Sequence, residues 1–426
     1  MTLFATLGTV LLALLGQPLF VIILAFAMIG FTVQDIPLSV IGAELYRLSD
    51  TPLLAAIPLF TFVGFLLSES KSSTRIVKLT DAFFGWMPSG LAFISLTTCA
   101  FFTAFTGASG ATIVALGALL LPALRHAKYP EKFSLGLVTS AGSLGLLLAP
   151  SVPLILFGIL AQQMNQGFNV TIEDLFIAGL MPTALMIIML ALYSFFAGGK
   201  AARRTTPFSM KNTLNAVWEA KWEIPLPVFV LGGIYSGYFA VSEAAAMTVF
   251  YTFVVEVLIY REIPFRDLKR ITAEAMIMVG GIMLVLATAM ALGNYFIDAQ
   301  VPMLVFEFIQ TYVDSKLTFL LLLNLFLLLL GAVLDIFAAL VLVVPLILPV
   351  AVAFGVDPVH LGIIFLANLQ IGYMTPPIGM NLFIASYRFD EPVTKIYKAS
   401  FSFMLVLLVA LIAITYIPWL SLAFIR

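Results

Sequence analysis

The sequence predicts an all-α polytopic membrane protein with inverted repeats, each containing a re-entrant helical hairpin and a broken transmembrane helix. Composition is the first observation behind this prediction, because 62% of the 426 residues are hydrophobic and only 10% are charged. In soluble domains about one quarter of the residues are charged. The second observation is that basic residues cluster in short segments between long apolar runs. These runs are too long and too apolar for the alternating strands of a β-barrel.

The basic segments orient the chain, since short loops rich in lysine and arginine stay in the cytoplasm. We assign to the cytoplasm the segments 68–78, 125–132, 198–223, 260–270 and 387–398, which hold most of the 21 basic residues. The loops assigned to the outside lie near 33–50, 162–172, 234–242, 298–315 and 354–360. No basic patch with interleaved aromatic residues occurs, so a nucleic-acid partner is not expected. Cys99 is the only cysteine, which excludes an intrachain disulfide and a cysteine metal site.

Two apolar stretches have both of their ends on one side of the membrane. Stretch 88–124 lies between basic segments, and stretch 317–350 lies between loops that are poor in basic residues. Two full crossings need roughly 40 residues plus a loop, at ~1.5 Å per residue and ~30 Å of hydrocarbon. The stretches have 37 and 34 residues, too few for two spans and too many for one. Each is therefore predicted to be a re-entrant hairpin, one entering from each side.

A broken single crossing follows each hairpin. Residues 133–161 are interrupted by glycines and by Pro150, and residues 361–386 by Thr375-Pro376-Pro377. Proline removes a backbone donor and breaks a helix. The two halves therefore repeat hairpin plus broken helix in opposite orientation, a pattern typical of secondary transporters with a binding site at the bilayer midplane. The predicted divisions are 1–87 as N-terminal scaffold helices, 88–163 as transport-domain repeat 1, 164–295 as further scaffold helices with the cytoplasmic loop 198–223, 296–386 as transport-domain repeat 2, and 387–426 as the C-terminal helix.

The breaks supply candidate binding groups. Helix N-termini offer free N–H groups to a carboxylate, and helix C-termini offer carbonyls to a cation. Asp335 is the only acidic residue in its stretch, and intramembrane charges are usually functional. Its alternative role is to cap the following half-helix. Side-chain oxygens or flexible tips are expected at Gly107, Ser109, Gly110, Thr112, Gly331, Thr375 and Asn381, although hydroxyls can bond to their own helix and glycines can serve close packing.

Two other function classes are weighed against a carrier. The motif Gly-Ala-Ser-Gly at 107–110 could belong to an intramembrane serine hydrolase, but a nucleophile needs a base within reach. His126 lies roughly 25 Å along the helix from Ser109, and His360 lies at an external segment end, so we expect both histidines to be solvated and the chain not to be an enzyme. A stand-alone channel would show a continuous polar stripe, whereas polar residues here collect at the breaks. Asn324 is expected to form an interhelical hydrogen bond, and Glu243 to be a helix-start carboxylate.

The sequence resembles the large membrane (M) subunit of a tripartite ATP-independent periplasmic (TRAP) transporter. The resemblance covers essentially the whole chain. It rests on "IPLFTFVG" (57–64), "FFTAFTGASGATIVALGALLLPAL" (101–124), "YPEKFSLGLVTSAGSLGLLLAPSVPLILFG" (129–158), "SEAAAMTVFY" (242–251), "LDIFAALVLVVPLILPV" (334–350) and "QIGYMTPPIGMNLF" (370–383).

This resemblance implies a sodium-driven, elevator-type importer of small organic acids in the bacterial inner membrane. It implies three kinds of partner besides membrane lipid: the organic-acid substrate, a periplasmic substrate-binding protein, and a small four-helix Q subunit, which is expected to be a separate chain. It places one sodium site near Gly107, Ser109 and Gly145, and the other near Gly331, Asp335, Met374 and Thr375. The expected substrate-binding residues are Ser109, Gly110, Thr112, Ser143, Pro150, Ser151, Pro376, Pro377 and Asn381.

Overall fold

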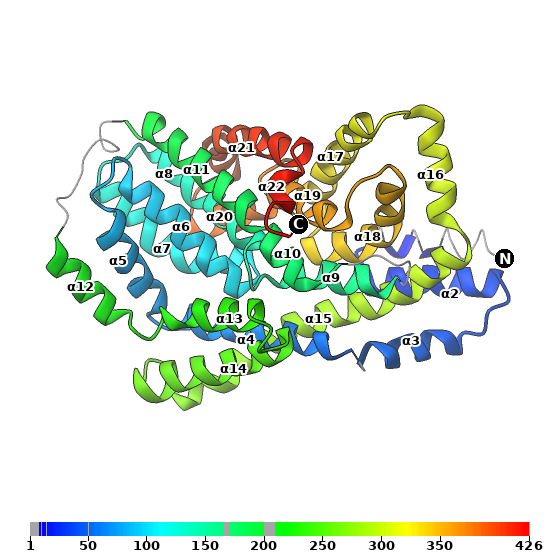
Figure 1. Ribbon diagram of the computed structural model, residues 1–426, viewed down its shortest axis with the longest axis horizontal. Helices are drawn as coiled ribbons and strands as arrows, with labels where there is room; N and C mark the ends of the chain where they lie inside the picture. The colour runs from blue at the N-terminus through cyan, green and yellow to red at the C-terminus, as the bar shows by residue number, and fades with distance from the viewer. Residues whose placement is uncertain are drawn as a thin grey trace.

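The computed structural model describes residues 8–9, 11–13, 15–49, 51–164, 170–199 and 209–425. Throughout these ranges the regular structure is helical (Figure 1). Eight helical segments within them are long and apolar enough to cross a bilayer. The all-α polytopic prediction is therefore confirmed.

Both predicted hairpins are present, and each is followed by a broken helix. Hairpin 1 consists of α6 (Gly90–Thr106) and α7 (Ser109–His126), and hairpin 2 consists of α17 (Lys316–Val333) and α18 (Ile336–Ala353). The first broken helix comprises α8 (Glu131–Ala141), the 3-10 turn η2 (Leu144–Leu147) and α9 (Val152–Gln163), and the second comprises α19 (Pro358–Gly372) and α20 (Met380–Phe389). Each break contains a cis proline, Pro150 in the first and Pro377 in the second. The structure thus shows the same sequence of elements in both repeats.

The other helices surround these two repeats. They are α2 (Leu19–Val33), α3 (Ser39–Ser49), η1 (Pro52–Ala55), α4 (Ala56–Glu69), α5 (Ser72–Phe84), α10 (Ile172–Ala178), α11 (Leu180–Ala197), α12 (Met210–Glu219), α13 (Pro225–Tyr235), α14 (Val241–Phe253), the π-helical η4 (Val254–Ile259), α15 (Phe265–Asp298), α16 (Val301–Tyr312), α21 (Val393–Tyr416) and α22 (Trp419–Leu422). Helix α16 occupies most of the external loop predicted at 298–315. The polar residues of this segment predict a loop, but the segment forms a helix whose exposed apolar residues include Leu304 and Phe308.

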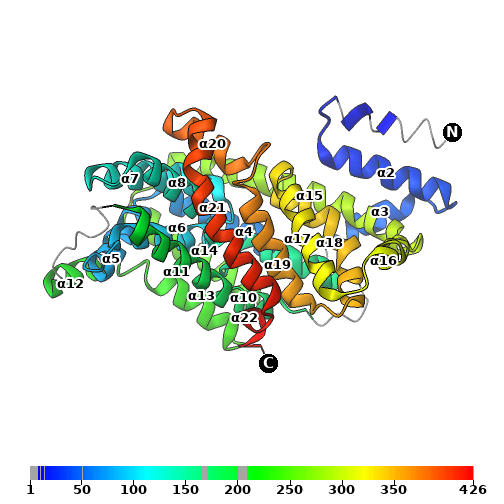
Figure 2. The same cartoon turned by 90° about the horizontal axis from the view of Figure 1, so that it is seen from above.

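The two hairpins lie on opposite sides of the molecule. Figures 1 and 2 place α6 and α7 toward one end, near α5 and α12, and α17 and α18 toward the other end, near α16. Helices α2 and α3 also lie at the end of α16 in both views.

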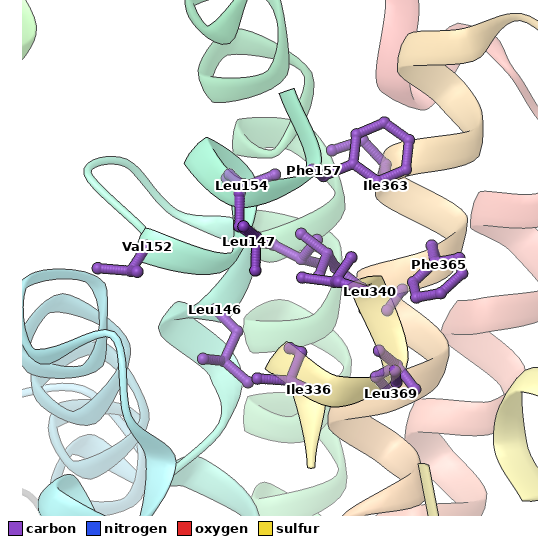
Figure 3. Packing of buried hydrophobic residues seen from close by; sticks show 14 of the residues in the cluster. Leu146, Leu147, Val152, Leu154, Phe157, Ile336, Leu340, Ile363, Phe365 and Leu369 are labelled. Carbon is purple, nitrogen blue, oxygen red and sulfur yellow. The ribbon is translucent and has the colours of Figure 1, made fainter. Parts of the chain in front are cut away.

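The core joins one repeat to the other. Figure 3 shows Leu147 and Phe157 of the first broken helix packed toward Leu340 of hairpin 2 and Phe365 of α19. The ring centroids of Phe157 and Phe365 are 6.4 Å apart. In lipid, helix association depends on such close packing more than on removal of apolar surface from water. The two repeats therefore share a core and do not form separate packing units.

A buried polar network ties hairpin 2 to α19 and α21. The Asn368 amide donates to Asn324 Oδ1 at 2.6 Å, and the Asn324 amide donates to Thr415 Oγ1 at 3.1 Å. The interhelical role expected of Asn324 is thus confirmed. The expectation that His360 is solvated is wrong, because His360 is 1% exposed and its ring nitrogens contact Ser421 Oγ and the Thr415 carbonyl. The fold carries α21 and α22 over this residue, which a sequence position alone does not reveal.

A buried charge cluster lies at one end of the scaffold helices. Arg75 on α5 is paired with Glu223, with Glu256 on η4 at 3.2 Å, and with Glu262 at 2.6 Å. Its guanidinium lies 3.9 Å from the centre of the Tyr260 ring. Burial raises the pKa of the Glu223 carboxyl against the opposing charge of Arg75. Arg75 belongs to the segment 68–78 assigned to the cytoplasm, and its packing against these residues leaves it only 8% exposed.

Replacing Arg75 by Met should destabilise the protein by about 3–5 kcal/mol, because buried carboxylates lose their counter-charge. The apparent melting temperature of the detergent-solubilised protein, followed by size-exclusion chromatography, measures this loss. Lys78→Met on the same helix is the control. Its partner Glu219 and Lys78 itself are about half exposed, so this change should cost at most about 1 kcal/mol. Equal melting temperatures for the two variants would contradict a stabilising role of the cluster.

Candidate functional site

The tip of hairpin 1 is a two-residue break. Gly107 ends α6 with φ +64°, a left-handed conformation that glycine adopts without strain. A Cβ on Gly107 would also lie 2.9 Å from Val152 Cγ2 of α9. Ala108 is extended, and α7 starts at Ser109 without a side-chain cap. The first N–H groups of α7 are therefore available to an acceptor that is not part of this helix.

At the tip of hairpin 2, the carboxylate of Asp335 caps the N-terminus of α18. Asp335 precedes α18, and its Oδ1 accepts hydrogen bonds from the N–H groups of Phe337 at 2.8 Å and Ala338 at 3.1 Å. The capping role considered for Asp335 is thus present in the structure. Both bonds use the same oxygen, so Oδ2 of this half-buried side chain remains for a further contact. A cap and an ion ligand are compatible roles for one carboxylate.

Both tips line one cavity of about 630 Å³, here called the tip cavity. Its lining includes Gly107, Ala108, Ser109, Gly110, Asp335, Ile336, Phe337, Ala338 and Tyr373, with Leu19 and Phe20 of α2 and Ile277, Gly281 and Val285 of α15 opposite. Two hairpins that enter from opposite sides can share a cavity only when both tips end at a common depth. This arrangement supports the predicted re-entrant hairpins over four complete spans.

Residues from both repeats meet at the start of α7. The Ser109 hydroxyl donates to Asn381 Oδ1 of α20 at 2.7 Å. Ser109 is 3% exposed and Asn381 is fully buried. The Asn381 Nδ2 group has no hydrogen-bond partner among the described residues. A buried amide donor without a partner costs about 1–3 kcal/mol, which a ligand accepting that hydrogen bond would offset.

Tyr373 was missed by the sequence analysis, although it directly precedes the second break. Its hydroxyl accepts from the N–H of Ile336 at 2.6 Å, and its carbonyl accepts from the N–H of Asn381 at 3.1 Å. The N–H of Gly379 donates to the Ala332 carbonyl at 3.1 Å. Tyr373 thus connects the tip of hairpin 2 to the start of α20. The sequence feature that could have identified Tyr373 is its position close to the predicted break at 375–377.

The remaining predicted hydroxyls bond within the protein. Thr112 Oγ1 lies 2.7 Å from Thr103 Oγ1, and Thr103 Oγ1 donates to the Gly142 carbonyl at 2.9 Å. Ser143 Oγ donates to the Gln370 carbonyl across the repeats at 3.4 Å. Thr375 Oγ1 donates to the Ile371 carbonyl at 3.1 Å. None of these side chains lines the tip cavity as Ser109 and Asp335 do.

The other predicted residues lie outside the lining of the tip cavity as well. Ser151 Oγ donates to the Leu146 carbonyl at 2.6 Å, Met374 is fully buried, and Pro376 and Pro377 are exposed. The residues outside that lining are Thr112, Ser143, Gly145, Pro150, Ser151, Gly331, Met374, Thr375, Pro376, Pro377 and Asn381. Ser109, Gly110, Gly107 and Asp335 are therefore the predicted residues that the structure gathers around the cavity, with Asn381 bonded to Ser109.

Gly145 and Gly331 occur where helices approach closely. A Cβ on Gly145 would overlap the Ala100 carbonyl oxygen of α6, and a Cβ on Gly331 would lie 3.1 Å from Leu369 Cα of α19. A Cβ added to Gly372 would lie 2.7 Å from the Gly331 carbonyl carbon, so these two glycines face each other. These glycines are explained by packing, as small residues are at helix contacts in membranes.

The tip cavity has an electrostatic asymmetry. Two helix N-termini face it, and Asp335 caps α18 while α7 is uncapped. Among the described residues, Asp335 is the only charged one in the lining. An anion is therefore favoured at α7 and a cation at Asp335. In the described part of the chain no group of three or more His, Cys, Asp or Glu residues could hold a metal ion.

Ser109 does not have the environment of a catalytic serine. Its hydroxyl donates to an amide oxygen, which cannot serve as a general base. Both ring nitrogens of His360 already contact other groups, Nδ1 the Ser421 hydroxyl and Nε2 the Thr415 carbonyl. The geometry therefore gives no support to the hydrolase alternative at 107–110.

Gly145→Ala should prevent correct folding, because the added Cβ meets backbone of α6 that cannot move away. The yield of monodisperse protein after detergent extraction measures this effect. Gly280→Ala on α15 is the matched control, since a Cβ there meets nothing within 4 Å. A Gly145→Ala variant that folds normally but loses sodium binding would show instead that the position acts as an ion ligand.

Comparison with known proteins agrees with this architecture. Residues 6–420 match the family described as the tripartite ATP-independent periplasmic transporter, DctM component. The chain is 32% identical over 392 residues to the isethionate TRAP transporter permease protein DctMQ of Oleidesulfovibrio alaskensis, covering 92% of this chain and 61% of that relative. It is 32% identical over 389 residues to the C4-dicarboxylate TRAP transporter large permease protein DctM of Vibrio cholerae, covering 86% and 84%.

A solved structure supports the fold alone. The YdaH transporter of Alcanivorax borkumensis superposes with a TM-score of 0.62 at 13% identity, covering 90% of this chain and 88% of that one. The family match spans nearly all of the residues, and the relatives are named as permeases and not as enzymes. The chain therefore belongs to the DctM family of TRAP transporters, whose members are the large permease subunits.

Proposed function

We propose that this subunit imports a small organic acid across the bacterial inner membrane, driven by sodium. The observation that carries the proposal is the tip cavity, where an uncapped helix N-terminus and a carboxylate face the same space. The substrate carboxylate binds at the start of α7, where the backbone N–H groups of Ser109 and Gly110 and the free Asn381 amide supply neutral donors. The described residues of the lining include no basic side chain, so a second anionic group on the substrate would go unpaired by them.

Sodium is proposed to bind near each tip. In this proposal, Asp335 Oδ2 and backbone carbonyls around Gly331 and Thr375 would bind one ion, and carbonyls around Gly107 and Gly145 would bind the other. Oxygen ligands suit a hard cation such as sodium. A sodium ion beside Asp335 would offset the cost of an unpaired carboxylate at membrane depth, about 2.5 kcal/mol or more on the insertion scale. Sodium occupancy would in this way be linked to the geometry of the tip.

Alternating access is proposed to follow an elevator motion. Both hairpins and both broken helices form the moving part, and α2, α4 and α15 belong to the static scaffold. The residues that α15 presents to the tip cavity are apolar or glycine, which suits a surface along which another part slides. A periplasmic substrate-binding protein delivers the acid, and a small four-helix Q subunit completes the membrane complex. The support for these two partners is that the chain belongs to a family of tripartite transporters and that its relatives are named as TRAP transporter permeases.

Uptake in proteoliposomes tests the proposal. The chain, co-reconstituted with its small subunit and matching binding protein, should accumulate a monocarboxylate when an inward sodium gradient is imposed. A panel of radiolabelled mono- and dicarboxylates identifies the acid, and we expect monoanions to be preferred because the lining holds one anion position. Replacing sodium by choline should abolish accumulation. Full-rate uptake in choline, or by this chain without its partners, would contradict the proposal.

Asp335→Asn should weaken sodium binding without unfolding α18. Asparagine caps helices about as well as aspartate, so the bonds to Phe337 and Ala338 can be kept while the charge is lost. The sodium concentration that half-saturates thermal stabilisation should rise by about tenfold or more, because a charge-assisted contact contributes about 1.5–3 kcal/mol. Choline chloride holds the ionic strength constant. Asp335→Ala, which also loses the cap, separates the two roles. An unchanged sodium response in the Asn variant would leave Asp335 with the capping role alone.

A further inference from the structure

A second cavity lies directly beside the tip cavity. It measures about 730 Å³ and is here called the inward cavity. Its lining is Phe65, Ser68, Glu69, Gly110, Ala111, Val114, Ala115, Glu274, Phe383, Ile384, Tyr387 and Arg388. Three of these residues are charged, and Glu69 is paired with Arg270 of the basic segment 260–270. The inward cavity is thus next to segments that the charge distribution assigns to the cytoplasm.

The two cavities have two lining residues in common, Gly110 and Ile384. These two residues touch each other, since a Cβ on Gly110 would lie 2.6 Å from Ile384 Cδ1. The Ile384 side chain therefore occupies the space that a larger residue at 110 would fill. It is half-buried and is not held by any hydrogen bond, so a change of rotamer is enough to move it.

This contact belongs to a continuous seam between α7 and α20. Asn381, Ile384 and Arg388 are spaced i, i+3 and i+7, which places them on one face of α20. They contact successive positions of α7: Asn381 bonds to Ser109, Ile384 packs on Gly110, and Arg388 Nε donates to the Val114 carbonyl at 2.9 Å. The polar contacts fix the helices on either side of Ile384. Ile384 is the part of the seam that is held by packing alone.

We propose that Ile384, packed on Gly110, is the barrier between the tip cavity and the inward cavity. This inference rests on the proposed transport function, in which the acid must leave the tip cavity toward the cytoplasm. The acid passes over Ile384 when its side chain turns away, along the space between the seam and scaffold helices α4 and α15. Ile384 is a positioning residue for release and does not bind the substrate.

Cysteine accessibility tests the barrier without substrate, sodium or transport. The reporter is Ala108→Cys in the tip cavity, in a Cys99→Ala background that removes the only native cysteine. Inside-out vesicles holding the full chain expose the cytoplasmic face to MTSET, a cationic methanethiosulfonate that does not cross the bilayer. The rate of modification at position 108 is measured for each variant. Failure of the transport function would leave this readout intact.

With Ile384 present, modification should be slow, and Ile384→Ala should accelerate it by about tenfold or more, as lowering a steric barrier does. Ile384→Val shortens the side chain by one methyl group and should give an intermediate rate in a variant that folds more readily. Phe383→Ala is the matched control, because Phe383 lines the inward cavity only and is 48% exposed. The Phe383→Ala variant should be modified at position 108 at the same rate as the protein with Ile384 and Phe383 unchanged.

Three outcomes would overturn the proposal. The first is rapid modification with Ile384 in place, which would mean that the contact does not separate the cavities. The second is an equal modification rate at position 108 for the Ile384→Ala variant and for the protein that keeps Ile384. The third is an equal acceleration by Phe383→Ala, which would indicate general loosening of α20. Size-exclusion profiles of all variants establish that the rates compare folded proteins.

Discussion

The structure depends on satisfying irregular backbone at membrane depth. Broken helices are tolerated in a bilayer only where protein or a water-filled cavity supplies the missing hydrogen bonds. In the second repeat, hydrogen bonds connect the hairpin tip to the break that follows α19. The N–H of Ile336 donates to the Tyr373 hydroxyl, and the N–H of Gly379 donates to the Ala332 carbonyl. The first repeat obtains partners from the second, since Ser109 bonds to Asn381 and Ser143 to the Gln370 carbonyl. The second repeat thus joins its breaks within itself, whereas the first repeat is bonded to the second, and these cross-repeat bonds lie next to the cavity that both tips line.

The chemistry of that cavity follows from how its two helix ends are capped. An aspartate in the first position before α18 neutralises the positive end of that helix, while Ala108 leaves the end of α7 open. Two similar repeats thus present opposite electrostatic preferences to the same space. One position favours an anion and the other a cation, which is the arrangement that symport of an acid with sodium requires. The residue that precedes each helix, Ala108 or Asp335, accounts for this difference.

The sequence was sufficient for features that depend on local chemistry. Gly107, Pro150 and Pro376 mark breaks because of their own backbone properties, and the basic segments orient the hairpins, so bounds were predicted within a few residues. Features that depend on distant segments could not be predicted. The burial of Arg75 depends on Glu223, Glu256 and Glu262, which are 148 to 187 residues away. The close approach of Gly145 to the backbone of α6 likewise depends on a segment distant from its own break.

The cross-repeat bonds also bear on how the cavity could change sides. Opening one hairpin by itself would break buried pairs such as Ile336 to Tyr373 and Ser109 to Asn381, at about 1–3 kcal/mol for each group left unpaired. The wall that α15 presents to the cavity, by contrast, consists of apolar side chains and Gly281. Sliding along that wall exchanges one set of dispersion contacts for another and leaves the buried hydrogen bonds intact. Displacing both tips together against α15 is therefore less costly than bending one of them, and this difference favours the proposed elevator over a hinged hairpin.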